Sequence, residues 1–240
     1  WIYRKKVQLF LSTKDPKIKY QGVIIPVTEL KIYSKINKLL SSKIEVAQII
    51  FAIENFKIQD MQKLAVRIKP SNFKTYLLNN IYDGEIEKSS FDLIIGEGFK
   101  LINYTANGKI KKTNLKIKDD FLIKDISFNF ALDKNLTLIN SIKATHKGVL
   151  VSNGSIDLQR KKNIVIKSKF NLKFDLNEDQ MSSLFKKTKF LKDNKVKAQG
   201  STLNEFDLRI NNKFKIIDYN FKATGQVLQF RLILKNKFKN

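Results

Sequence analysis

The residue types that usually carry out catalysis or bind metals are few and isolated in this sequence. It contains no cysteine, and its only histidine, His146, has no HxH or HExxH partner. Cysteine catalysis and thiolate metal sites are therefore excluded, and we expect His146 to be structural. We predict that the chain is not an enzyme and that it binds no cofactor and no metal.

Two other motifs favour structural roles over chemistry. Gly96-Glu97-Gly98 is not followed by a helix-opening glycine, so it indicates a hairpin turn and not a nucleotide site. Asp92 and Asp207 each follow a phenylalanine in similar segments and could be taken for a pair of catalytic acids. Both fall on the polar phase of their strands, and we therefore expect a cross-strand lysine partner for each.

The charge of the chain is strongly positive, 46 − 22 = +24. Such a charge favours nucleic acid or anionic lipid as a partner. However, only five of the basic residues are arginines, and the 46 − 5 = 41 lysines are spread along the whole chain. Lys, Asn, Ile and Phe also share A/T-rich codons. Two interpretations stay open: a solvated polar face enriched in lysine by codon usage, or a role near anionic surfaces.

Period-two alternation of apolar and polar residues is the main structural signal, and it is typical of half-buried strands. The clearest case is Phe170, Leu172, Phe174 and Leu176, with polar residues between them. The same pattern occurs at 91–95, 115–117, 126–130, 136–138, 156–158, 164–166, 206–210 and 230–234. Turns are predicted at Asn107-Gly108, Asp133-Lys134-Asn135, Lys147-Gly148, Asn153-Gly154 and Asn211-Asn212.

Short helices are expected to interrupt the strands. One lies within Lys35–Ser42, where Ile36, Leu39 and Leu40 share a face. A second begins after the cap Ser71, carries Phe73, Tyr76, Leu77 and Ile81 on one face, and ends at Gly84. A third is capped by Asn177 and carries Met181, Leu184 and Phe185. A further helical stretch is possible at Met61–Lys69.

An internal repeat divides the chain into related parts. FDLIIGEGFKLINY (Phe91–Tyr104) and FDLRINNKFKIIDY (Phe206–Tyr219) share eight of fourteen positions without a gap. We therefore predict two related units, each a helix followed by a β-meander. The alternative is convergence on a common hairpin pattern.

Alternating strands give the predicted sheet one apolar face. This face could either line a groove or belong to a closed core. In a groove the apolar side chains contact a ligand, whereas in a closed core helices cover them. For the groove we expect acyl chains to contact an apolar wall. Its candidate residues are Phe91, Leu93, Ile95, Ile126, Phe128, Phe130, Phe170, Leu172, Phe174, Phe206, Leu208 and Ile210.

The stretch from Val23 to Asp60, VIIPVTELKIYSKINKLLSSKIEVAQIIFAIENFKIQD, resembles the AsmA-like superfamily, including its relatives with a DUF3971-type region. The shared pattern is a strand, a short Leu-rich helix and a strand of the "gkIeV.qI.f" kind. A later pattern, at Gly84–Ile117 and Gly200–Leu234, is also similar. The resemblance implies a bridge-like lipid transport protein of the bacterial envelope, which is anchored in the inner membrane and moves phospholipid across the periplasm.

Together these observations predict a mainly β fold with a few short helices (α+β), an elongated and curled antiparallel sheet with an apolar groove. We expect three parts: residues 1–83 with strands and helical insertions, 84–176 as the first meander, and 177–240 as a helix and second meander. No apolar run approaches the ~18 residues of a spanning helix. Because the sequence begins at Trp1, we expect an internal fragment whose membrane anchor lies outside it.

The expected partners are phospholipid acyl chains and a membrane, with no nucleic acid. The alternative is a basic, β-rich protein that binds nucleic acid or has a structural role in the envelope. An outer-membrane barrel would share the alternation, but the helical insertions and the lysines on many strands disfavour it.

Overall fold

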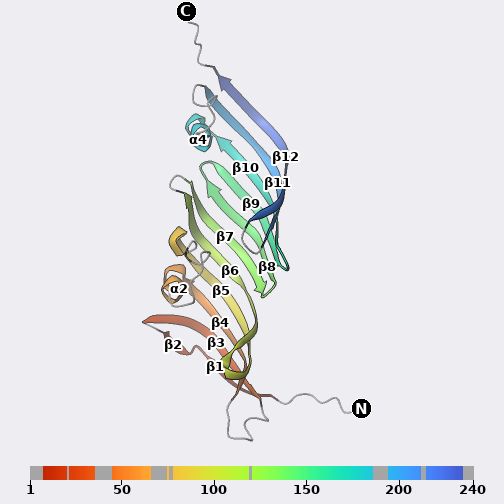
Figure 1. Cartoon of the computed structure of the whole chain (residues 1–240). Helices are drawn as coiled ribbons and strands as arrows, with labels where there is room; N and C mark the ends of the chain where they lie inside the picture. Colours follow the sequence, from red (N-terminus) through yellow and green to blue (C-terminus); the bar gives the residue numbers. More distant parts are fainter. Residues whose placement is uncertain are drawn as a thin grey trace, which may run out of the picture. The chain divides into compact units, whose positions relative to one another are not determined.

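Antiparallel β-strands make up most of the chain in a computed structural model, which describes residues 8–20, 22–35, 45–65, 75, 78–118, 121–185, 194–211 and 215–234 (Figure 1). The strands are β1 (Gln8–Lys14), β2 (Lys17–Tyr20), β3 (Val23–Lys35), β4 (Val46–Lys57), β5 (Ile81–Ile95), β6 (Leu101–Lys118), β7 (Phe121–Asp133), β8 (Leu136–His146), β9 (Val149–Arg160), β10 (Ile164–Leu176), β11 (Lys195–Ile210) and β12 (Ile216–Ile233).

These strands form a single open sheet in which neighbours in sequence are neighbours in space. The order is β1-β3-β4-β5-β6-β7-β8-β9-β10-β11-β12, and β2 pairs with β3 beside β1. A meander of this kind follows from alternating strands joined by short turns, because each strand can pair with the next without a crossover. The prediction of a mainly β, antiparallel fold with few helices is therefore confirmed.

The chain divides into two compact units. Unit 1 consists of residues 1–113 and 129–137, and unit 2 consists of residues 114–128 and 138–240. The predicted boundary residues Gly84 and Leu176 lie inside β5 and at the end of β10.

Helices α2 (Ile58–Ala65) and α4 (Glu178–Leu184) accompany the strands in the described part of the chain. Helix α2 follows β4 directly, and α4 follows β10 and begins at the predicted cap Asn177. Residues 78–80 are helical, but Ile81 and Gly84 belong to β5, so the prediction that Gly84 ends this helix was wrong. The predicted helix within Lys35–Ser42, and the residues Ser71, Phe73, Tyr76 and Leu77, lie outside the described residues. No helix that the structure describes is long and apolar enough to cross a membrane.

Some of the turn predictions are confirmed and others are wrong. Gly96-Glu97-Gly98 begins the single turn η1 (Glu97–Phe99), and Lys147-Gly148 joins β8 to β9. Lys134 and Asn135 join β7 to β8.

Asn107-Gly108 and Asn153-Gly154 instead lie inside β6 and β9. Asn153 is left-handed, with φ 50°, and the register of β9 against β10 shifts beside it. The dipeptide that favours a turn is used here for a β-bulge, because a bulge needs the same backbone conformation.

Candidate functional site

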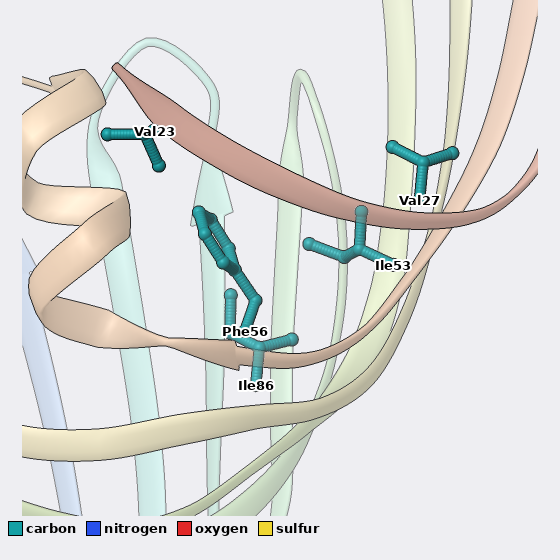
Figure 2. Close-up of a cluster of buried hydrophobic side chains, with 5 residues drawn as sticks. All are labelled: Val23, Val27, Ile53, Phe56 and Ile86. Atoms are coloured by element: carbon teal, nitrogen blue, oxygen red, sulfur yellow. The ribbon is translucent and has the colours of Figure 1, made fainter. Parts of the chain in front are cut away.

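In unit 1 the apolar face of the sheet contains a small buried cluster. Val23 and Val27 from β3, Ile53 and Phe56 from β4, and Ile86 from β5 lie together on one side of the strands (Figure 2). Met61 and Leu64 of α2 pack against this cluster. Helix α2 therefore covers the part of the face where β4 ends, and this part is an ordinary core.

An interruption of the period-two alternation in β4 and β5 keeps these buried side chains on one face of the sheet. Ile53 and Phe56 are both buried although they are three residues apart, and Asn55 between them has φ 52°. In β5, Ile86 and Ser89 are buried at the same spacing, beside the partners Phe56 and Ile53. Regular period-two alternation would turn one member of each pair to the other face.

Beyond α2 the apolar face of unit 1 continues along β4 and β5 and becomes more accessible. The rings of Phe51 and Phe91 stack with their centroids 4.7 Å apart. Leu93 lies opposite Ile49, and both are half-buried, whereas Ile95 at the strand end is buried. The predicted residues Phe91, Leu93 and Ile95 therefore share this face with the buried cluster.

In unit 2 the apolar face is carried by β10 and β11. Their register is continuous over thirteen residue pairs, so directly opposite residues share a face. Phe170, Leu172 and Phe174 occupy one half of this face. Phe206, Leu208 and Ile210 occupy the other half, opposite Ser168, Ile166 and Ile164. All six predicted residues are half-buried, so they retain contact with solvent.

Glycines on neighbouring strands lie beneath two of these phenylalanine rings. A Cβ atom at Gly200 would lie 2.8 Å from Cζ of Phe174, and one at Gly154 would lie 2.7 Å from Cδ1 of Phe170. The rings therefore lie across the adjacent strand and cover backbone that has no side chain of its own. We call the apolar surface that these rings form between the strands the apolar floor.

Helix α4 lies near one end of this floor. It contacts β10 and β11, where Leu176 and Val196 are buried. Near the middle, Thr202 and Asn204 interrupt the apolar surface, and Nδ2 of Asn204 donates to Oγ1 of Thr202 at 2.9 Å. The floor is therefore closed at the α4 end and accessible over the remaining length of β10 and β11.

The last strand, β12, exposes apolar side chains along its whole length. It pairs with β11 and ends the strand order, and every one of its eighteen residues is exposed. Phe221, Val227 and Phe230 lie opposite Phe206, Gly200 and Ala198, so they extend the same apolar face. Their exposed fractions are 58%, 64% and 60%. The alternation of Phe230, Leu232 and Leu234 predicted a strand here, but no residue of this strand was among the predicted groove residues.

The predicted residues of β7 are less clearly arranged. Ile126, Phe128 and Phe130 are half-buried. Phe130 lines a hollow of about 780 Å³ in unit 1, together with Glu54, Lys88 and Asn107. Its neighbours there are polar and charged, unlike those of the phenylalanines on β10.

On the opposite, polar face of the sheet, most charged residues that lie directly across from each other have opposite charges. In the seven strand pairings whose register the structure gives, nine directly opposite pairs join two charged residues, and eight of these are of opposite sign. Random pairing of 46 basic and 22 acidic side chains would make fewer than half of them opposite. The eight pairs are Lys14–Glu29, Glu54–Lys88, Lys57–Glu85, Asp157–Lys167, Lys167–Asp207, Lys169–Glu205, Glu205–Lys222 and Arg209–Asp218.

Ion pairs on this face hold carboxylates in their charged form. Lys109 and Lys111 contact Glu87 at 2.8 and 3.1 Å, and their hydrogen bonds lower the pKa of that carboxyl. Lys169 contacts Glu205 at 2.9 Å, and its hydrogen bond lowers the pKa of Glu205. These carboxylates are therefore poor general acids or bases near neutral pH.

The two carboxylates singled out in the sequence differ in their partners. Asp207 lies opposite Lys167 and beside a hollow of about 490 Å³ in unit 2, as expected for a cross-strand lysine partner. Asp92 lies opposite Ile50 of β4 and accepts a hydrogen bond of 2.7 Å from Nε2 of Gln48, so its cross-strand partner on β4 is not a lysine.

His146 occupies a structural position in unit 2. Its Nδ1 lies 2.7 Å from the carbonyl oxygen of Leu122, and its ring lies against Phe121 with centroids 4.2 Å apart. Among the described residues, no three His, Asp or Glu side chains are grouped as metal ligands. The geometry is that of a side chain that joins two neighbouring strands.

Comparisons with known proteins give no relative: no family model, curated protein or solved structure matches this chain. Function is therefore inferred from the residues and from the faces of the sheet.

Proposed function

We propose that the chain binds lipid acyl chains on its apolar face and acts as a segment of a periplasmic bridge-like protein that supports phospholipid transport between inner and outer membranes. The observation that carries the acyl-binding part is the accessible apolar floor of β10 and β11, which β12 extends. The resemblance of Val23–Asp60 to AsmA-like proteins is what supports the envelope location and the transport role.

The accessible floor of unit 2 matches the chemistry of an acyl chain. Phe170, Leu172 and Phe174 present hydrocarbon without a hydrogen-bonding group, and they are half-buried although they lie in the centre of long strands. Every described strand belongs to one sheet, so no second sheet covers this face within the described residues. Each methylene buried there contributes about 0.8 kcal/mol, so about ten methylenes gain on the order of 8 kcal/mol before ordering costs.

The polar face supports binding rather than catalysis. Seven of its carboxylates lie directly opposite a lysine or arginine, and the pKa of Glu87 and of Glu205 is lowered by lysine neighbours. A paired, permanently charged carboxylate serves solubility and strand register. The two faces thus have separate roles, one wet and charged and the other available to hydrocarbon.

Site-specific photo-crosslinking tests this proposal with a matched control. A photoreactive phenylalanine analogue replaces Leu172, on the apolar face of β10, or its neighbour Lys173, on the polar face. After expression in a diderm bacterium, we expect phospholipid adducts at position 172, detected by mass spectrometry, and none or at least tenfold fewer at position 173.

Native mass spectrometry of protein purified without delipidation supplies the second measurement. We expect bound phospholipid in the wild-type chain and its loss in Leu172→Glu. Equal crosslinking at positions 172 and 173, or protein that never carries lipid, would show that the apolar face does not bind acyl chains.

A further inference from the structure

One cross-strand pair on the polar face joins two residues of the same charge. Lys197 of β11 lies directly opposite Arg231 of β12, and this is the single like-charged pair among the nine charged pairs of the seven strand pairings whose register is known. Like charges that face each other across antiparallel strands destabilise the sheet. Both residues are exposed, and neither forms an ion pair with a described residue.

A third cation and two carboxylates lie beside this pair. Lys195 is two residues before Lys197 and therefore shares its face, and its Nζ lies 3.0 Å from Glu178 at the start of α4. The pKa of Glu178 is lowered, first by the hydrogen bond from Lys195 and then by the charges of Lys195, Lys197 and Arg231. Lys195 already engages Glu178, and Asp175 lies opposite Gln199, two residues from Lys197 on the same face. The three cations and two carboxylates therefore keep a net charge of +1.

We propose that Lys197 and Arg231 together bind the phosphate group of an anionic ligand. A guanidinium presents two parallel N–H donors that match two phosphate oxygens, and a lysine beside it supplies a second positive charge. A bound dianion would replace the repulsion between the two side chains with attraction to a shared partner.

The position of the pair leaves two sources for this phosphate. Val196 and Leu232, one residue away on each strand, also lie directly opposite each other and belong to the apolar face. Since β12 is a terminal strand, a phosphate at Arg231 lies at the rim of that face. The ligand is therefore either a lipid headgroup or a free phosphate. The proposed phosphate site depends only on the charged side chains and not on acyl binding.

Thermal unfolding of the full chain with inorganic phosphate is the first test. At constant ionic strength, replacing chloride by phosphate is expected to raise the Tm of the wild type by several degrees. Lys197→Glu makes an opposite-charge pair with Arg231, so it is expected to raise the Tm in chloride and to abolish the phosphate response. Arg209→Gln, on the same strand opposite Asp218, is the control and is expected to keep the response.

Vesicle binding is the second test and distinguishes the two sources. A lipid headgroup is indicated if Lys197→Glu and Arg231→Gln weaken cosedimentation with phosphatidylglycerol vesicles at least tenfold while Arg209→Gln does not. A free phosphate is indicated if only the thermal response changes.

The proposal is wrong if phosphate stabilises the wild type no more than chloride does. It is also wrong if Arg209→Gln loses as much as the two site variants, because the attraction would then belong to the whole basic chain. The crosslinking at Leu172 involves no phosphate, so it fails or succeeds separately.

Discussion

At the scale of single residues, the phenylalanines of unit 2 depend on what lies beneath them. Phe174 lies over Gly200 and Phe170 lies over Gly154, so each ring rests on backbone of the next strand. A side chain at either glycine would compete with the ring for the same space. The apolar floor is thus specified by glycines as much as by aromatic residues.

Gly200→Val is expected to lower the free energy of unfolding by about 1–3 kcal/mol, because a Cβ atom there would clash with the backbone carbonyl oxygen of Gln226 and would lie 2.8 Å from Cζ of Phe174. Ser201→Val, one residue later and on the other face, is the control and is expected to change stability by no more than about 0.5 kcal/mol. Urea unfolding measures both. Equal stability of the two variants would show that the ring of Phe174 and the backbone of β12 both move aside without cost.

At the scale of secondary-structure elements, α4 is too short to be stable alone. It has seven residues, and isolated helices of this length are not populated in water. A capping box holds its first turn: Oδ1 of Asn177 accepts from the backbone N–H of Gln180, and Oε1 of Gln180 accepts from the backbone N–H of Asn177, each at 2.9 Å. The cap and the contacts with β10 and β11 together position the helix at the end of the apolar floor.

Asn177→Ala removes the cap acceptor and is expected to cost about 1 kcal/mol. The backbone amides of α4 should then exchange hydrogen about fivefold faster or more, while those of β10 keep their rate. Asn177→Asp keeps an acceptor at the same place and should behave like the wild type. The capping account fails if Asn177→Asp loosens α4 as much as Asn177→Ala does.

At the scale of the whole molecule, charge order explains how a chain of +24 forms long strands. In the seven strand pairings of known register, eight of nine directly opposite charged pairs are attractive, and seven of the 22 acidic residues lie opposite a strand lysine or arginine in this way. Each exposed pair contributes little by itself. Together they remove the repulsion that an excess of lysine would otherwise place between adjacent strands.

Acid is therefore expected to destabilise the chain. The pKa of Glu87, Glu178 and Glu205 is lowered by lysine partners, so each group binds fewer protons in the folded chain than in the unfolded chain. Its stabilising contribution is complete above the unfolded value near 4.5 and is lost as the pH falls through the lower folded value.

The urea midpoint should thus fall between pH 7 and pH 3.5, and it should fall less in the double variant Glu87→Gln, Glu205→Gln. Glu97→Gln, in the exposed turn η1, is the control and should keep the full pH dependence. If the double variant responds to acid like the wild type, these ion pairs do not set the stability of the sheet.

Part of the fold and of the candidate site could be predicted from the sequence. Alternation placed Phe170, Leu172 and Phe174 on one face of a strand, and Asn177 was predicted as the cap of α4, because strand period and helix caps depend on residues close in sequence. The same local rules gave the wrong result at Asn107-Gly108 and Asn153-Gly154. A left-handed or unencumbered backbone suits both a turn and the interior of a bulged strand, and only pairing with neighbouring strands decides between them.

What the sequence by itself determined was the class of structure: strands with one apolar face and a polar face rich in lysine. Only the tertiary structure decided which strands lie side by side. Pairing brought Phe206 opposite Ser168, laid Phe174 over Gly200, and set Lys197 against Arg231. These contacts join residues separated by tens of positions in the chain, and register across strands follows from the packing of whole faces, which no short stretch of sequence specifies.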